Sequence, residues 1–174
     1  MEYTGAPPLT NDEIESLLSE AIRARFCSLN KDGTIHVVPV AYMHTDDEIL
    51  FITPEASQKV QNVKRNKNVT VLIDVDNPYR GVIVYGQAEL VYDDVFSTNV
   101  MLLEKVMSKD LAECYTHEIF NTKTKLVVVR VKPRRMVSYD YSKDEMHKRV
   151  LRAVSLKLAN YYFNNRLGRG RCKV

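Results

Sequence analysis

Cysteine is scarce in this chain, and its spacing excludes two kinds of site. The three cysteines, Cys27, Cys114 and Cys172, lie far apart in 174 residues. A disulfide-stapled fold needs an even and denser set, and a metal site needs closely spaced ligands. The four histidines show no pairing or metal spacing either. The sequence therefore predicts no metal site, and it indicates a reducing, cytoplasmic environment.

Long apolar runs are also absent. No stretch approaches the ~18 residues that a membrane-spanning helix requires, and the polar, acidic N-terminus is not typical of a signal peptide. Hydrophobic residues make up 45% of the chain and charged residues 27%, as in ordinary globular proteins. This length suits a single domain with a core of its own.

Several catalytic signatures are missing. The sequence contains no GxGxxG motif, no phosphate-binding Walker loop and no defensible Ser-His-Asp arrangement. Basic residues do not interleave with aromatic residues as they do on nucleic-acid-binding sheets, so nucleic-acid binding is disfavoured. Catalytic side chains remain unidentified from sequence.

Charge is distributed unevenly along the chain. Residues 142–174 hold nine Lys/Arg and two Asp/Glu, whereas the preceding 141 residues hold 16 and 20. A basic tail after an acidic body indicates either an anionic partner or docking on the acidic surface.

Hydrophobic periodicity predicts about six strands interrupted by helices. The first helix, Asn11–Ile22, follows a capping box at Thr10 and Glu13. The expected strands are Arg25–Leu29, Thr34–Tyr42, Glu48–Thr53, Val69–Val75, Arg80–Tyr92 and Lys125–Val131, and the further helices are Glu55–Asn66 and Asp93–Phe120. Pro133 should end the last strand, with Val137–Tyr141 as an added edge, and Gly86 should mark a bulge or a close backbone contact. This pattern favours a small closed or half-closed β-barrel flanked by helices.

The end of the strand Glu48–Thr53 has the features of a phosphate site. Thr53-Pro54 leads into a helical segment that carries Ser57, Lys59 and Asn62. Free N–H groups and the positive end of the helix dipole favour an anion at such a helix start, and Ser57 and Lys59 add a hydroxyl and a cation. The alternative is an ordinary lysine-rich surface helix.

Several motifs of this region, taken in order, resemble the FMN-binding split-barrel proteins related to pyridoxamine 5'-phosphate oxidase. They are Asp32-Gly33, Phe51-Ile52-Thr53, Ser57-Gln58-Lys59 with Asn62, and the strand that begins Arg80-Gly81-Val82. The resemblance covers about Ala21 to Tyr92, with a weaker similarity at Lys125–Tyr141.

This resemblance implies a six-stranded Greek-key split barrel in an α+β arrangement. It also implies a homodimer with FMN in a cleft between the subunits, acting on a small-molecule substrate. The cofactor-binding residues that it implies are Val38, Pro39, Val40, Ile52, Thr53, Ser57, Gln58, Lys59, Asn62, Arg80 and Gly81.

The chain departs from that family at several positions. An Arg-Lys pair is usual where Gln58-Lys59 stands, and Gln occurs where Gly81 stands. Pyridoxamine phosphate oxidases begin and end the flavin strand with cations, at positions occupied here by Val37 and Tyr42. We therefore expect a flavin-binding oxidoreductase that is not a pyridoxamine phosphate oxidase.

Two alternatives remain open. The first is a deazaflavin-dependent reductase, whose longer polyglutamyl tail would use Lys64, Arg65 and Lys67. The second is a flavin-binding protein without enzymatic activity. Haem is disfavoured, because haem-handling relatives depend on a His-rich C-terminal segment and this tail has only His147.

The chain should comprise the barrel domain, residues 1–141, and a C-terminal helix with its tail, residues 142–174. A capping box at Ser142 and Glu145 should open this helix, whose apolar stripe is Met146, Val150, Val154, Leu158 and Tyr161. We expect the helix to dock on the barrel or on a partner subunit, with Gly168–Val174 disordered and free. Binding to a membrane surface is the alternative.

Overall fold

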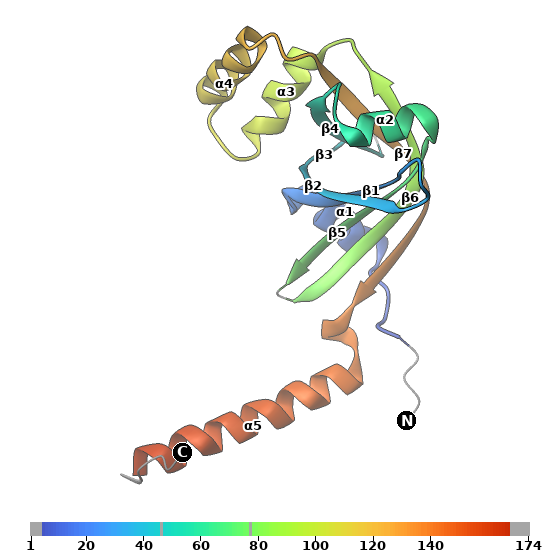
Figure 1. The fold of residues 1–174 in the computed structure, drawn as a ribbon. Coiled ribbons are helices and arrows are strands. Elements are labelled where there is room, and N and C mark those ends of the chain that lie inside the picture. Colours follow the sequence, from blue (N-terminus) through green and yellow to red (C-terminus); the bar gives the residue numbers. More distant parts are fainter. Residues whose placement is uncertain (1–4, 46, 77, 168–174) are drawn as a thin grey trace.

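The computed structural model describes residues 5–45, 47–76 and 78–167, with side chains on the last helix described as far as Leu158. The chain folds into one curled antiparallel sheet with helices at its ends and flank (Figure 1). The strands are β1 Arg23–Leu29, β2 Ile35–Ala41, β3 Met43–Thr45, β4 Glu48–Pro54, β5 Asn68–Asp76, β6 Tyr79–Val91 and β7 Leu126–Asp140. The helices are α1 Asn11–Glu20, α2 Gln58–Arg65, α3 Val95–Glu104, α4 Lys109–Asn121, the 3-10 turn η1 Tyr141–Lys143 and α5 Glu145–Leu167. No helix in these ranges is both long and apolar enough to cross a membrane.

The sheet has seven strands in the order β2-β1-β5-β6-β7-β4-β3, one more than the six expected. The additional strand arises because the expected strand Thr34–Tyr42 bends at Tyr42 and continues as β3. Its first part pairs with β1 and its last part with β4. One bent segment thus supplies both edges of the sheet, and the split-barrel fold is confirmed.

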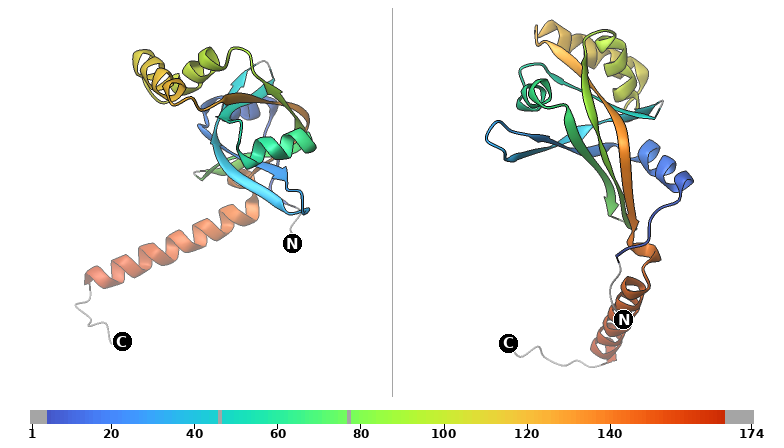
Figure 2. Two further views of the ribbon diagram at one scale, coloured as in Figure 1. Left: turned by 45° about the horizontal axis from the view of Figure 1, so that its top comes forward. Right: turned by 90° about the vertical axis from the view of Figure 1, so that its right-hand side faces the viewer.

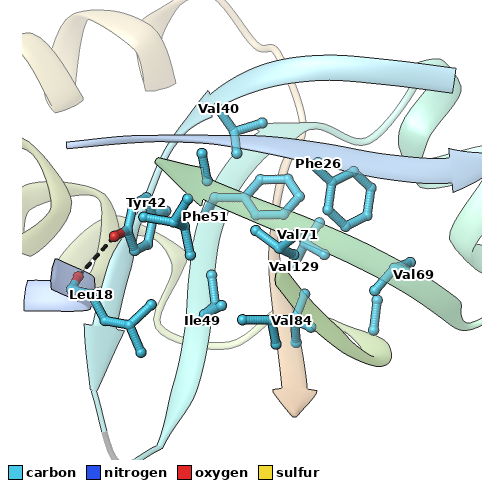
Figure 3. Close-up of a cluster of buried hydrophobic side chains, with 14 of the residues drawn as sticks. Leu18, Phe26, Val40, Tyr42, Ile49, Phe51, Val69, Val71, Val84 and Val129 are labelled. Atoms are coloured by element: carbon cyan, nitrogen blue, oxygen red, sulfur yellow. Dashed lines mark hydrogen bonds between the residues drawn. The ribbon is translucent and has the colours of Figure 1, made fainter. Parts of the chain in front are cut away.

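The bend is fixed by the burial of Tyr42. Its ring is fully buried, its hydroxyl donates to the Leu18 carbonyl at 2.8 Å, and its N–H donates to the Ile22 carbonyl at 3.3 Å (Figure 3). A buried phenol needs such a partner, so α1 holds the corner where the two edges meet. The capping box of Thr10 and Glu13 at the start of α1 is confirmed.

Alternating apolar residues of the strands fill the barrel interior. Phe26 and Phe51 meet edge to face with ring centroids 4.8 Å apart, and valines of β5, β6 and β7 surround them (Figure 3). A second buried cluster lies beneath α3 and consists of Met43, Leu50, Val95, Leu102 and Val128. The helix α3 is therefore anchored to the outer side of β4 and β7, and α4 packs on α3, where the Asn99 amide donates to the Thr116 hydroxyl at 3.0 Å.

Three expectations about the second half of the chain were wrong. The segment Asp93–Phe120 forms two helices rather than one, since the chain turns between Glu104 and Lys109. Pro133 does not end β7, which continues to Asp140, so Val137–Tyr141 is not a separate edge. Beyond Val131 the strand pairs with β6 alone, and the missing proline N–H is accommodated at an irregularity.

That irregularity confirms the expectation for Gly86. The register shifts between Tyr85 and Gly86, where Gly86 faces Pro133. A Cβ atom at Gly86 would lie 2.5 Å from the Lys132 carbonyl oxygen, so only glycine fits.

The capping box expected at Ser142 was also wrong. Ser142 lies in η1, where its N–H donates to the Asp140 carboxylate at 2.8 Å. The helix α5 is capped by Asp144 instead, whose carboxylate accepts from the His147 N–H at 2.6 Å. Asp144 rather than Ser142 caps α5 because the three residues before Asp144 form η1.

Candidate functional site

The junction between β4 and α2 brings three of the predicted residues together. The Lys59 ammonium donates to the Thr53 hydroxyl at 2.9 Å, and the Thr53 and Ser57 hydroxyl oxygens lie 3.4 Å apart. Thr53 is buried at the end of β4, and Ser57 precedes the first turn of α2. The side chain of Ser57 makes no capping bond, so it does not occupy the free N–H groups of that turn. A cation, two hydroxyls and a helix N-terminus therefore converge.

The charge of Lys59 is poorly compensated. Burial lowers the pKa of its ammonium below the ordinary value of 10.5. No carboxylate forms an ion pair with Lys59 in the part of the chain that the structure describes. An anion beside the Nζ atom would supply the missing counter-charge. Among the predicted residues, those at this junction are therefore the best suited to bind an anion.

Asn62 anchors α2 to the barrel. Its amide nitrogen donates to the Ser28 hydroxyl at 3.1 Å and to the Asn30 side-chain oxygen at 2.9 Å. Its amide oxygen accepts from Gln58 and from Arg65, each at 2.9 Å. A primary amide offers two donors and two acceptor positions, so the bonds within the chain use all four. The buried Asn62 sets the place of α2 rather than offering a free group, and Gln58, exposed beside it, is tied to it.

Two of the three cations that a deazaflavin tail would use already have partners. Lys64 pairs with Glu55 at 3.0 Å, and this contact is the main reason why the pKa of the Glu55 carboxyl is lowered. Arg65 donates to the Asn62 oxygen, as above. Only Lys67 of the three is exposed without such a bond among the described residues.

The strand β2, on which the flavin ring is expected, lies at an edge of the sheet and pairs with β1 alone. Val38 and Val40 point toward the core, with Val40 buried, whereas Pro39 faces outward. Val37 is 53% exposed. One side of the β2 backbone is thus open to a ligand, and its N–H and carbonyl groups are unpaired along that side. Ile52, also predicted, is half-buried in β4.

Arg80 and Gly81 lie far from the Lys59 junction in the same chain. Asn68, just after α2, pairs with Gln87 of β6. Arg80 lies seven residues before Gln87 on that strand, which is roughly 23 Å at about 3.3 Å per residue. Gly81 lies close against the Tyr139 side chain, since a Cβ there would be 2.6 Å from the Tyr139 hydroxyl oxygen. The Nε atom of Arg80 is buried without a hydrogen-bond partner among the described residues. The register of β6 therefore places these two residues at the end of the strand remote from α2.

An apolar groove lies on the outer face of the sheet. It has a volume of about 370 Å³, and its walls include Leu29, Ile35, Thr70, Tyr85 and Arg134. Ile35 is 70% exposed. A contiguous apolar surface of this kind, next to the open edge of β2, is typical of an interaction face.

Sequence reasoning missed one cluster. The ligand atoms of Glu15, His44 and Asp47 lie within 4.8 Å of one another. Glu15 and Asp47 are exposed, while the His44 side chain is 7% exposed. The three positions come from α1, β3 and the following turn, so no spacing in the sequence links them. Exposed carboxylates commonly gather without a metal, and we assign this cluster no function.

The chain matches the family model described as pyridoxamine 5'-phosphate oxidase over residues 10–139. No curated protein sequence matches the chain.

Several solved structures share the fold. A conserved hypothetical protein from Mycobacterium tuberculosis has a TM-score of 0.67 at 25% identity, over 80% of this chain and 89% of that chain. A protein named F420 reductase has a TM-score of 0.58 at 22% identity, over 73% of this chain and 98% of that chain. A FAD-binding protein from Mesorhizobium loti has a TM-score of 0.56 at 19% identity, over 78% and 96%.

Proposed function

The chain belongs to the pyridoxamine 5'-phosphate oxidase family, and we propose that it is an FMN-dependent oxidoreductase of the reducing cytoplasm. The observation that carries this proposal is the junction of Thr53, Ser57 and Lys59, where a half-buried cation stands at a helix N-terminus without a carboxylate partner. A terminal phosphate suits these groups, since it accepts from the ammonium, the hydroxyls and the first-turn N–H groups together.

The flavin ring would lie along β2. The open edge offers backbone donors and acceptors around Val38 and Val40, and Pro39 lacks a backbone N–H. Ring and phosphate would then be held by neighbouring parts of the barrel, because β1 joins β2 to Asn62 through Ser28. When bound, the flavin supplies the redox chemistry, and these residues bind and orient it. A site that only binds and orients the flavin requires no acid–base pair, and we identify none here.

We further propose a homodimer with the flavin between subunits. Arg80 and Gly81 lie at the end of β6 remote from α2, and a twofold axis can bring them to the ligand from the second copy.

The substrate is proposed to be a small molecule other than pyridoxamine phosphate. The two positions at which pyridoxamine phosphate oxidases carry cations hold Val37, an exposed apolar residue, and Tyr42, which is fully buried with its hydroxyl bonded to Leu18. Neither can receive a phosphate. FMN-loaded protein should turn over pyridoxamine phosphate far more slowly than a genuine oxidase, and a comparable rate would contradict this assignment.

A deazaflavin cofactor is the second candidate, because one structure with this fold is named F420 reductase. Its longer anionic tail would require free cations beyond the junction, yet Lys64 and Arg65 already bind Glu55 and Asn62. FMN is therefore the better fit. A flavin-binding protein without turnover is the outcome if the bound flavin cannot be reduced by any donor tested.

Lys59→Met tests the phosphate site directly. Replacing the ammonium with an apolar group of similar length should weaken FMN binding by about ten- to a hundredfold, the worth of a charge-assisted contact. Riboflavin, which has the same ring without the phosphate, should bind both proteins alike. Flavin fluorescence quenching measures all four affinities.

The pH dependence of FMN affinity provides a second test of Lys59. The lowered pKa of Lys59 means that FMN affinity should decline with rising pH before an ordinary lysine titrates, and the variant should lack that decline. Lys67→Met, at an exposed cation just after α2, is the matched control and should change nothing. An equal loss of riboflavin and FMN binding in the Lys59 variant would remove Lys59 from the phosphate site.

A further inference from the structure

The helix α5 projects away from its own barrel, so docking on its own barrel is not what the structure shows (Figures 1 and 2). Its apolar residues are about half exposed along the part with described side chains. Met146, Val150, Val154 and Leu158 recur every four residues, and Leu151 completes the stripe at about 3.6 residues per turn. A lone helix with such a face is only marginally stable in water. The stripe therefore needs a partner surface.

The base of α5 is held firmly, which fixes the direction of the helix. Asp140 and Asp144 are buried and bond to η1 and to the first turn of α5. Lys143 pairs with Glu13 of α1, and the Tyr141 and His147 rings lie 5.6 Å apart. The arm thus leaves the barrel in a defined orientation, ready for one particular surface.

The helix α4 presents a matching surface. Leu111 and Tyr115 are more than half exposed on one face, one turn apart. Glu118, exposed, follows on the same face, with Cys114 beside it. We refer to Leu111, Cys114, Tyr115 and Glu118 as the α4 face.

We propose that α5 of each subunit packs across the α4 face of a second copy of this chain. Figure 1 shows that α5 and the α3–α4 pair project from opposite ends of the barrel toward the same side, leaving the space between them open. A twofold axis through that space places α5 of one copy beside α4 of the other and, by symmetry, repeats the contact. The two reciprocal contacts clasp the dimer, which extends the homodimer proposed above.

The charges of the two helices favour α4 as the surface that α5 contacts. Residues 145–158 carry four Lys/Arg and one Glu, whereas residues 93–121 carry six Asp/Glu and two Lys. Lys148 and Arg149 flank the apolar stripe and Lys157 lies within it, where Glu118 of the α4 face and Asp110 in the first turn of α4 can meet them. Two α5 helices packed on each other would instead bring like charges together.

Cross-linking tests the contact, because Cys114 already stands on the α4 face. Val154→Cys, in the middle of the stripe and combined with Cys172→Ser to remove the tail thiol, should form a disulfide-linked dimer under mild oxidation. Peptide mass mapping should join the introduced thiol to Cys114. Arg152→Cys in the same background is the matched control, since Arg152 lies on the side of the helix opposite Val154, and it should remain largely uncrosslinked.

Three results would overturn the proposal. They are no cross-link although the protein sediments as a dimer, a cross-link between two introduced thiols, and equal cross-linking of the two variants. A full-length protein that sediments as a monomer and floats with anionic phosphatidylserine vesicles would make α5 a membrane-surface helix instead. The cross-link requires no flavin, so its outcome is independent of whether FMN binds.

Discussion

The helices α2 and α5 have similar charge but differ in how they are attached to the barrel. Both are rich in lysine and arginine, and both follow directly from a strand or turn of the barrel. The eight-residue α2 buries Val60, Asn62 and Val63, and Asn62 alone makes four side-chain hydrogen bonds, two of them to Ser28 and Asn30 outside the helix. The 23-residue α5 exposes every side chain from Leu151 to Leu158. A basic helix can thus be part of the barrel or an arm extending from it.

The difference follows from what each helix is bonded to. A short helix is unstable alone, so α2 persists because buried polar bonds and two valines fix it against β1 and the turn after it. The longer α5 is fixed only at its first turn, through Asp144 and η1. Substitutions in α2 should therefore alter the folded state of a single chain, whereas substitutions in α5 should alter association.

Asn62→Ala should have the largest effect on stability. It leaves Ser28, Asn30, Gln58 and Arg65 without their shared partner and creates a small cavity beneath α2. Unsatisfied buried polar groups cost about 1–3 kcal/mol, so we expect a loss of about 3 kcal/mol. For a chain of this size that lowers the melting temperature by roughly 6–12 °C, as measured by circular dichroism.

The control for this substitution is Gln61→Ala on the exposed face of α2. The Gln61 side chain makes one hydrogen bond among the described residues, to the Glu55 carbonyl at 3.3 Å, and its loss should be close to neutral. If the two variants melted at the same temperature, the bonds of Asn62 would not be what holds α2, and the contrast with α5 would fail.

Ending the chain after Lys148 should have a smaller effect, and on a different quantity. The shortened chain keeps η1 and the Asp144 cap but loses most of the apolar stripe. Each large side chain of the stripe contributes on the order of 1 kcal/mol if half of it is buried in the dimer. We expect the dimer dissociation constant, measured by analytical ultracentrifugation, to rise about tenfold or more.

Melting of the dilute monomer should be unchanged in that shortened chain. The matched control ends after Leu167, so that it removes only residues outside those that the structure describes. A monomer melting temperature that fell with the first truncation would show that α5 stabilises its own barrel. That result would remove the distinction drawn between α2 and α5.

The barrel could be predicted from sequence because its signals are local. Apolar strand patterns predicted six strand segments, and the capping box at Thr10 predicted the start of α1. The bend at Tyr42 could not be predicted, since it depends on a bond to Leu18, 24 residues away. The prediction for Pro133 was wrong for a similar reason. Whether a proline ends a strand depends on the strand beside it, and the pairing of β4 with β7 ends before Pro133.

The candidate site was predictable in part. The proximity of Thr53, Ser57 and Lys59 follows from a strand running into a helix, which sequence spacing can reveal. The role of Asn62 could not be read from sequence, because Ser28 and Asn30, which it bonds, lie in an earlier part of the chain. The position of Arg80 depends on strand register, and its ligand would involve a second copy that one sequence does not display. The segment Gly168–Val174, expected to be disordered, lies outside the described residues, as does the side chain of Tyr161.

Glu13→Gln should have the smallest effect, and it tests whether the base of α5 is fixed to the barrel. The contact with Lys143 is the main reason why the pKa of the Glu13 carboxyl is lowered from 4.5 to about 2. A carboxyl with a lowered pKa stabilises the folded state above its ordinary pKa, and that contribution is lost as the pH falls from 4.5 toward 2. Glutamine can still bond the Thr10 N–H in the capping box, so the substitution removes only the ion pair.

The variant should therefore melt slightly below the parent protein at neutral pH, and the difference should vanish as the pH approaches 2. Both side chains of this pair are partly exposed to water, so added salt should also reduce the difference. Asp12→Asn removes a charge from the same first turn of α1 without touching Lys143, and it controls for the helix dipole. If the two substitutions had identical pH profiles, the pair of Glu13 with Lys143 would not hold η1 to α1. The arm would then be free to swing, and a defined contact with the partner's α4 face would be harder to reach.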